Sequence, residues 1–174
     1  MSAAEDFVAA VQALAKAMRD AAEDPADQIR LLMALAAATP REAGNPTADL
    51  CRRAALTALA RASATYQPAA YEEAAALRET ICGLLWAEEI HAADQGEDAV
   101  FDAFRALRIA VAVDLTARAA NLARIRTVQT AAPLPALVLA NRLYGDASRA
   151  DELTDYAGAA NPLFLPARFS ARDR

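Results

Sequence analysis

The sequence predicts a mainly α protein: an Ala-rich antiparallel bundle of about five helices over residues 1–124, then a small βααβ module over residues 125–169. Residues 170–174 are expected to form a frayed tail. Three observations support this prediction. Alanine, the strongest helix former, accounts for 50 of the 174 residues, and glycine for only 5. Apolar residues recur at helical spacing up to the end of the bundle. Beyond it, β-branched residues and prolines interrupt that spacing.

The first two helices are predicted over residues 2–23 and 25–39. Asp24 stands before a proline, which is typical of a helix start, because Asp caps free backbone N–H groups and Pro fits the first turn. Thr39 precedes another proline, where a helix normally ends. The apolar residues assigned to these helices are Phe7, Val11, Leu14 and Met18, expected in one stripe, and Ile29, Leu32, Met33 and Leu35.

Three further helices are predicted over residues 45–66, 68–92 and 97–124. Asn45 repeats the cap-then-proline signal, and Gly96 separates the last two helices. Their inward residues are expected to be Leu50, Leu56, Leu59, Leu77, Ile81, Leu84, Leu85, Val100, Phe104, Leu107, Val111, Leu115 and Leu122. Because alanine contributes little to burial, these larger residues must supply most of it. Because the core contains few large apolar residues, a partner protein could complete it. A bundle that is stable without a partner is an equal alternative.

In the final part of the chain, the helical spacing of apolar residues is interrupted. The β-branched stretch 125–130 predicts a strand, and 134–144, with Leu137, Leu143 and Tyr144 as apolar residues, predicts a helix. Gly145 is expected to end that helix in a left-handed conformation.

A second short helix is predicted from Arg149 to about Gly158, with Ser148 and Asp151 at the spacing of a capping box. Asn161-Pro162 then predicts a turn. The run 163–166 predicts a weak edge strand, since Pro166 cannot continue a ladder of hydrogen bonds.

Two motifs in this region resemble the LysM-type βααβ module: NRLYGDASR at 141–149 and NPLFLP at 161–166. A wider stretch, roughly residues 100–166, is similar to the C-terminal half of the Mu-like phage tail protein known as the DNA circularisation, or circulation, protein. The resemblance implies a structural component of a contractile phage or prophage tail, near the junction of tail tube and baseplate. It implies docking to other tail or baseplate proteins as a homo- or hetero-oligomer, in the virion tail and in the host cytoplasm during assembly.

The candidate interface residues in these motifs are Arg142, Tyr144, Gly145, Asp146, Ser148, Arg149, Asn161, Pro162 and Phe164. Their residue types favour structural roles over ligand contact. Tyr144 is expected to bury its ring and keep its hydroxyl at the surface. The two arginines are expected to pair with Asp146 or Asp151, or with carbonyl groups at helix ends.

Two other functions remain open at this stage. A LysM-type groove for peptidoglycan or another glycan would lie between residues 130–134 and 159–163, but Ala131-Ala132-Pro133 offers few side-chain hydrogen bonds there. A helical regulatory protein that presents its acidic face to a partner is the third reading.

Charge and hydropathy argue against several classes of function. The net charge is −5, and a surface that neutralises phosphates normally has a basic stripe, so direct nucleic-acid binding is not expected. The arginines at 105, 108, 118, 124 and 126 are expected to form a solvated face. No membrane span is predicted. The acidic start differs from a secretory signal, so export by that route is not expected.

The sequence predicts no enzyme, no cofactor and no metal. Glu72-Glu73 and Glu88-Glu89 are adjacent on helices and therefore point in different directions. The single histidine, His91, cannot complete a zinc site with Cys51 and Cys82, which lack metal-ligand spacing. Both cysteines are expected to be small buried thiols, with a disulfide between them as the alternative.

Overall fold

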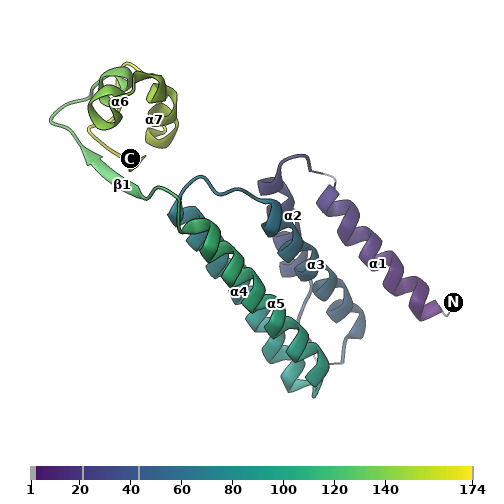
Figure 1. The fold of residues 1–174 in the computed structure, drawn as a ribbon. Coiled ribbons are helices and arrows are strands. Elements are labelled where there is room, and N and C mark those ends of the chain that lie inside the picture. Colours follow the sequence, from purple (N-terminus) through teal and green to yellow (C-terminus); the bar gives the residue numbers. More distant parts are fainter. Residues whose placement is uncertain (1–2, 21, 43, 174) are drawn as a thin grey trace. The chain divides into compact units, whose positions relative to one another are not determined.

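The computed structural model describes residues 3–20, 22–42 and 44–173 (Figure 1). It is mainly helical with a small two-stranded antiparallel sheet, which confirms the predicted fold class at that level. The chain divides into two compact units. Unit 1 comprises residues 1–68 and 74–118, and unit 2 comprises residues 69–73 and 119–174.

The helices of unit 1 have the bounds Ala3–Asp20 (α1), Pro25–Ala38 (α2), Pro46–Thr65 (α3), Tyr71–Asp94 (α4, whose first turn belongs to unit 2) and Asp98–Ala119 (α5). In unit 1, α2 and α3 begin at the prolines where the sequence signals predict, whereas the predicted helix 68–92 begins at Tyr71 instead of Pro68. The Asp24 side chain accepts a hydrogen bond from the Ala26 N–H at 2.9 Å, and that of Asn45 accepts one from Ala48 at 3.1 Å. These caps satisfy backbone donors that have no partner inside the helix.

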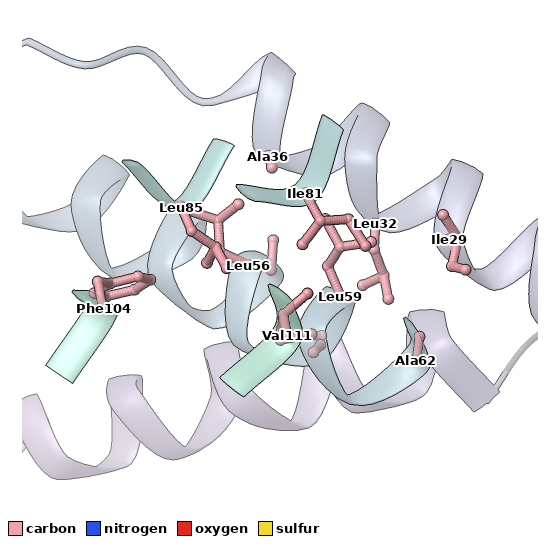
Figure 2. Close-up of a cluster of buried hydrophobic side chains, with 14 of the residues drawn as sticks. Ile29, Leu32, Ala36, Leu56, Leu59, Ala62, Ile81, Leu85, Phe104 and Val111 are labelled. Carbon is pink, nitrogen blue, oxygen red and sulfur yellow. The ribbon is translucent and has the colours of Figure 1, made fainter. Parts of the chain in front are cut away.

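A single apolar cluster fills the interior of unit 1 (Figure 2). Leu56 and Leu59 of α3 lie at its centre and are completely buried. The other helices contribute Ala15, Ile29, Leu32, Ala36, Ile81, Leu85, Phe104, Val111 and Leu115. Alanines on α3, such as Ala55 and Ala62, let neighbouring helices approach closely because a methyl group occupies little space.

Three details of the predicted bundle are wrong or lie outside the described residues. Leu14 is 55% exposed, and α1 instead buries Val11 and Ala15. The side chains of Phe7 and Met18 lie outside the described part of the structure. The fifth helix ends at Ala119 rather than near residue 124, since the chain turns there with a hydrogen bond from the Leu122 N–H to the Ala119 carbonyl.

Unit 2 contains β1 (Ile125–Gln129), α6 (Ala136–Tyr144), a 3₁₀ turn (Ala147–Arg149), α7 (Ala150–Ala157) and β2 (Arg168–Arg172). The two strands pair antiparallel, with Val128 opposite Phe169. The predicted first strand is therefore confirmed. The core of unit 2 contains Val128, Ala136, Leu139, Ala140, Leu153, Leu165, Phe169 and Ala171.

The second strand forms later in the chain than predicted. Residues 163–166 supply only an isolated bridge, between Leu165 and Leu134, and Pro166 ends it. The strand itself is Arg168–Arg172, so the expected frayed tail from residue 170 contributes to the sheet. The physical reason is alternation along the strand: Phe169 and Ala171 are buried in the core, while Arg168 and Ser170 are exposed.

None of the helices in the described ranges combines the length and apolar character that crossing a lipid bilayer requires.

Candidate docking site

Gly145 forms the turn between the two helices of unit 2, as predicted. It ends α6 with a φ of 72°, and its N–H donates to the Asn141 carbonyl at 2.9 Å. This left-handed conformation carries no steric penalty for glycine, whereas a Cβ would crowd the backbone. The turn brings α7 back against α6, so that Leu139 and Leu153 share one core.

Asp146 is the cap of the turn that follows, in place of the predicted capping box. Its Oδ1 accepts hydrogen bonds from the Ser148 N–H at 2.9 Å and the Ser148 hydroxyl at 2.7 Å. These two bonds lower the pKa of Asp146. No side-chain cap is present at the start of α7, so the expected Ser148–Asp151 box is wrong. Asp146 acts as the cap instead of Ser148, because it stands directly before the 3₁₀ turn, where the free N–H groups lie.

Arg149, Tyr144, Glu152 and Arg172 form a connected group that we call the motif cluster. Arg149 donates from Nε and Nη2 to the two carboxylate oxygens of Glu152, each at 2.8 Å. Its guanidinium also lies 3.5 Å from the centre of the Tyr144 ring. The Tyr144 hydroxyl donates to the Arg172 carbonyl at 2.8 Å, and Arg172 forms an ion pair with Glu152. The cluster therefore ties α6, the 3₁₀ turn, α7 and β2 together.

Two predicted details of these residues are corrected. Arg149 pairs with Glu152 rather than with Asp146 or Asp151, because a bidentate contact suits the planar guanidinium. The Tyr144 hydroxyl does not remain at the surface but binds the backbone of β2, and burial raises the pKa of this tyrosine. Arg142 is exposed and makes no ion pair with the described part of the chain.

Asn161 and Pro162 form the predicted turn. The Asn161 side chain accepts from the Leu163 N–H at 2.9 Å, and its carbonyl accepts from the Phe164 N–H at 3.2 Å. The Pro162 carbonyl accepts from the N–H of Ala136 at 2.7 Å, which fastens the turn to the start of α6. This hydrogen bond thus links the turn to the helix beside it.

Three large apolar residues at this junction have exposed side chains. They are Leu137, Leu163 and Phe164, with exposures of 62%, 59% and 66%, and we call them the apolar patch. Their proximity follows from the backbone, because residues 134–136 are hydrogen-bonded to residues 162–165. Pro133 and Pro162 beside them are exposed as well. Phe164, predicted as an interface residue, therefore lies on an apolar surface.

Neither Leu137 nor Leu163 is among the predicted interface residues, and the prediction places Leu137 with the apolar residues of its helix. A signal existed for Leu137: Ala136, Leu139, Ala140 and Leu143 follow helical spacing, and Leu137 does not belong to that stripe. For Leu163 no comparable signal exists, because its exposure depends on how the turn packs on α6.

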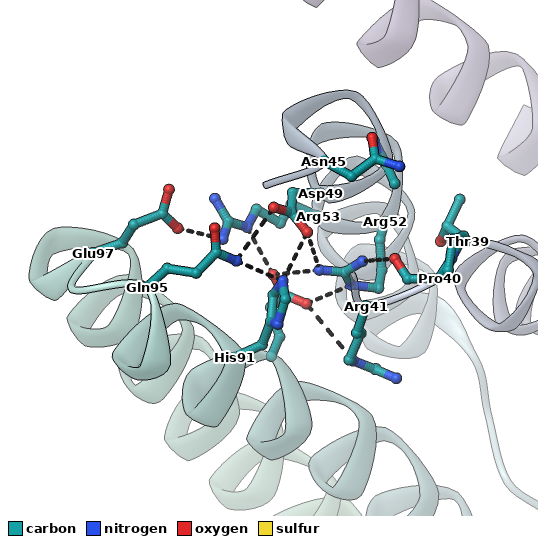
Figure 3. A network of polar contacts seen from close by, with 12 residues as sticks. Thr39, Pro40, Arg41, Asn45, Asp49, Arg52, Arg53, His91, Gln95 and Glu97 are labelled. Atoms are coloured by element: carbon teal, nitrogen blue, oxygen red, sulfur yellow. Dashed lines mark hydrogen bonds and ion pairs between the residues drawn. The ribbon is translucent and has the colours of Figure 1, made fainter. Parts of the chain in front are cut away.

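A second polar group, which we call the buried charge cluster, lies inside unit 1 (Figure 3). Arg52 of α3 is completely buried and donates to Glu88 of α4 at 2.6 Å, to Asp49 at 2.5 Å and to the Pro40 carbonyl at 2.6 Å. Arg53 donates to Glu88 at 2.7 Å and also binds Glu97.

His91 and Gln95 of α4 complete the buried charge cluster around Asp49. The His91 Nε2 lies 2.8 Å from the Asp49 Oδ1, and Gln95 donates to the other carboxylate oxygen at 3.3 Å. Burial by itself raises the pKa of Asp49, but the hydrogen bonds from Arg52, His91 and Gln95 outweigh it and hold the pKa below its usual range. The Asp49 carboxylate is thus kept ionised, and Asp49 and Glu88 are both bonded to arginines of the same cluster, which suits a structural role.

The other charged and thiol residues also have structural surroundings. Glu89 points away from Glu88 and accepts from Arg108, so the two adjacent carboxylates diverge as predicted. Arg108 and Arg118 are half-buried rather than part of a solvated face, since Arg108 binds Glu89 and Arg118 donates to the carbonyls of Ser63 and Tyr66 at the end of α3. Cys51 and Cys82 are free thiols. Within residues 3–20, 22–42 and 44–173, no group of histidines, cysteines and carboxylates has the arrangement of a metal site.

Comparison of the sequence with known protein families and with curated proteins finds no match.

Proposed function

We propose that this chain is a non-catalytic assembly protein that docks onto neighbouring subunits through its C-terminal unit. In this proposal, α1 to α5 form the Ala-rich bundle and unit 2 is a LysM-like module. The setting is the one that the sequence resemblance implies, the tail or baseplate of a Mu-like contractile phage. The partners are other tail or baseplate proteins.

The observation that carries the proposal is the apolar patch. Leu137, Leu163 and Phe164 are side chains of the kind that proteins bury, yet each is more than half exposed. Neighbouring exposed apolar residues are typical of protein–protein contact sites. An aromatic side chain at the centre of such a surface commonly carries much of the binding free energy.

The polar residues of the motifs favour docking over chemistry. Hydrogen bonds within unit 2 occupy the side chains of Asp146, Ser148 and Arg149. The Asn161 side chain is hydrogen-bonded within its own turn. Few side-chain donors near the patch therefore remain for a small polar ligand. Apolar contact is the chemistry that this surface offers.

Binding to purified tail-tube and baseplate hub proteins, measured by size-exclusion chromatography with light scattering and by surface plasmon resonance, tests the proposal. Phe164→Ser is expected to weaken binding by about 30-fold, the effect of losing a contact worth about 2 kcal/mol. Trp86→Ser is the matched control, since Trp86 is 57% exposed on α4 in unit 1. A wild-type chain that binds none of these proteins, or equal losses in both variants, would contradict the proposal.

A glycan-binding module is the second candidate, because the exposed Phe164 directly follows one of the two segments where a LysM-type groove is expected, and Leu165 beside it pairs with Leu134 of the other segment. Against it, Thr130 already donates to the Ala132 carbonyl, and the Asn161 side chain is occupied. A pull-down on purified cell-wall sacculi separates the candidates. Retention of the wild-type chain on the sacculi, with loss of retention in Phe164→Ser, would favour glycan binding. No retention of the wild-type chain would rule glycan binding out.

A further inference from the structure

Unit 1 contains a groove of about 570 Å³ between α1 and α3, closed at one side by Phe104 of α5. This volume lies within the roughly 300–1,000 Å³ range of sites that hold small organic ligands. The groove is separate from the apolar patch, which belongs to unit 2. It is therefore independent of the proposed docking function.

The groove exists because its walls are built from small side chains. Ala9 and Ala13 of α1 face Ala54 and Ala58 of α3, and methyl groups do not fill the space between the two helices. Leu50 and Phe104 add larger apolar surface. At about 1.5 Å per residue, the stretch of α3 that lines the groove is about 16 Å long. The result is an elongated, largely apolar trough.

Four cationic residues line the groove, and their charges are not equally neutralised. Arg53 binds both Glu88 and Glu97 and belongs to the buried charge cluster. Lys16 and Arg19 share a single carboxylate, that of Asp20. Arg61 has no hydrogen bond or ion pair with any described residue. A positive charge is thus left over at Lys16, Arg19 and Arg61, although the chain as a whole carries a net charge of −5.

The three incompletely neutralised cations lie at one end of the groove. α1 and α3 run in the same direction (Figure 1), with Lys16 and Arg19 in the last turns of α1 and Arg61 near the end of α3. The opposite end is lined by Ala9, Leu50 and other residues without a free charge. The groove is therefore apolar along its length and cationic at its end.

We propose that this groove binds an anionic amphiphile, a single apolar chain with a carboxylate or phosphate head. The chain lies along Ala13, Ala54 and Phe104, where it is removed from water. The head lies between Lys16, Arg19 and Arg61, whose N–H groups donate charge-assisted hydrogen bonds to its oxygens.

Isothermal titration calorimetry of the full chain tests this with three probes below their micelle concentrations: dodecanoate, dodecyl phosphate and dodecyltrimethylammonium. The two anions are expected to bind with one-to-one stoichiometry and the cation at least tenfold more weakly. Affinity for the anions should fall as salt is raised, because ions screen the exposed head-group contacts. Equal binding of anion and cation, or no binding of either anion, would overturn the proposal.

Two variants locate the site. Arg61→Glu reverses an exposed charge and should weaken dodecanoate binding at least tenfold, while Arg105→Glu, an exposed arginine of α5 outside the groove, should leave it unchanged. Ala13→Leu narrows the trough from an exposed position and should also weaken binding at least tenfold. Circular dichroism confirms that each variant is folded. Wild-type affinity in both Arg61→Glu and Ala13→Leu would overturn the proposal, as would an equal loss in Arg105→Glu.

Discussion

Each unit of the protein contains an arginine that joins separate elements, but the two arginines differ in burial and in the reach of their contacts. Arg52 of the buried charge cluster is completely enclosed, and its partner Glu88 lies 36 residues away in the chain. The Arg149 side chain of the motif cluster keeps 24% of its surface exposed, and its partner Glu152 lies three residues away.

The difference in burial decides what each cluster contributes to stability. Around Arg52 no water can replace a lost partner, so removal of one carboxylate leaves a buried charge without compensation. Around Arg149, water can reach the groups, and a similar ion pair contributes only about 0–1 kcal/mol. The same pairing of arginine with carboxylate therefore has a large effect in unit 1 and a small one in unit 2.

Removal of Glu88 should have the largest effect on stability and tests the difference between the buried charge cluster and the motif cluster. We expect Glu88→Ala to lower the free energy of unfolding by about 3–5 kcal/mol, because Arg52 loses its main counter-charge in a buried site. Urea denaturation followed by circular dichroism measures the effect. Glu79→Ala on the exposed side of the same helix is the control and should change stability by less than about 0.5 kcal/mol. Similar values for the two variants would show that the cluster contributes little.

The same substitution, Gly to Ala, should act in opposite directions in the two units. Gly145→Ala is expected to destabilise unit 2 by about 1 kcal/mol, since φ is 72° there. Gly83→Ala in the middle of α4 should stabilise by about 0.5–1 kcal/mol, because the added methyl meets no atom within 4 Å and alanine favours the helix. Thermal unfolding of both variants measures the two signs. If Gly145→Ala leaves the stability unchanged, the turn does not require glycine at this position.

The smallest expected effect is at Glu152. The hydrogen bonds from Arg149, and then the charge of Arg172, lower the pKa of Glu152 in the folded state below its ordinary value of 4.5. Its contribution is therefore fully present above pH 4.5 and is lost as the pH falls through the folded-state pKa. Glu152→Gln should cost about 1 kcal/mol or less at pH 7.

Urea denaturation of the wild type and of Glu152→Gln at a series of pH values checks this. The difference between the two chains should shrink below pH 4.5 and vanish once the carboxyl is protonated in the folded state as well. A difference that stays constant at low pH would mean that the effect is one of packing rather than charge.

Most local signals predict the structure correctly in both units, the Ser148–Asp151 capping box being the exception. The caps at Asp24 and Asn45 and the left-handed turn at Gly145 act within a few residues, so they can be recognised without knowledge of the fold. The second strand was placed too early, because its pairing with β1 depends on residues far away in the chain. The partners of Arg52 were not foreseen at all, since nothing in the local pattern links it to Glu88.

The candidate site shows the same division. The motif predicts Phe164 and the turn at Asn161-Pro162, but not the exposure of Leu163, because that depends on how the turn packs on α6.

By itself, the sequence determined the helical character of the protein, the capped starts of α2 and α3 and the turn at Gly145, because these rest on hydrogen bonds and steric preferences within a few residues. Only the tertiary structure decided which faces are buried, how Arg52 is neutralised, and which apolar side chains of unit 2 remain in water. The physical reason is that burial depends on which elements meet, and the elements that meet here are distant in the chain.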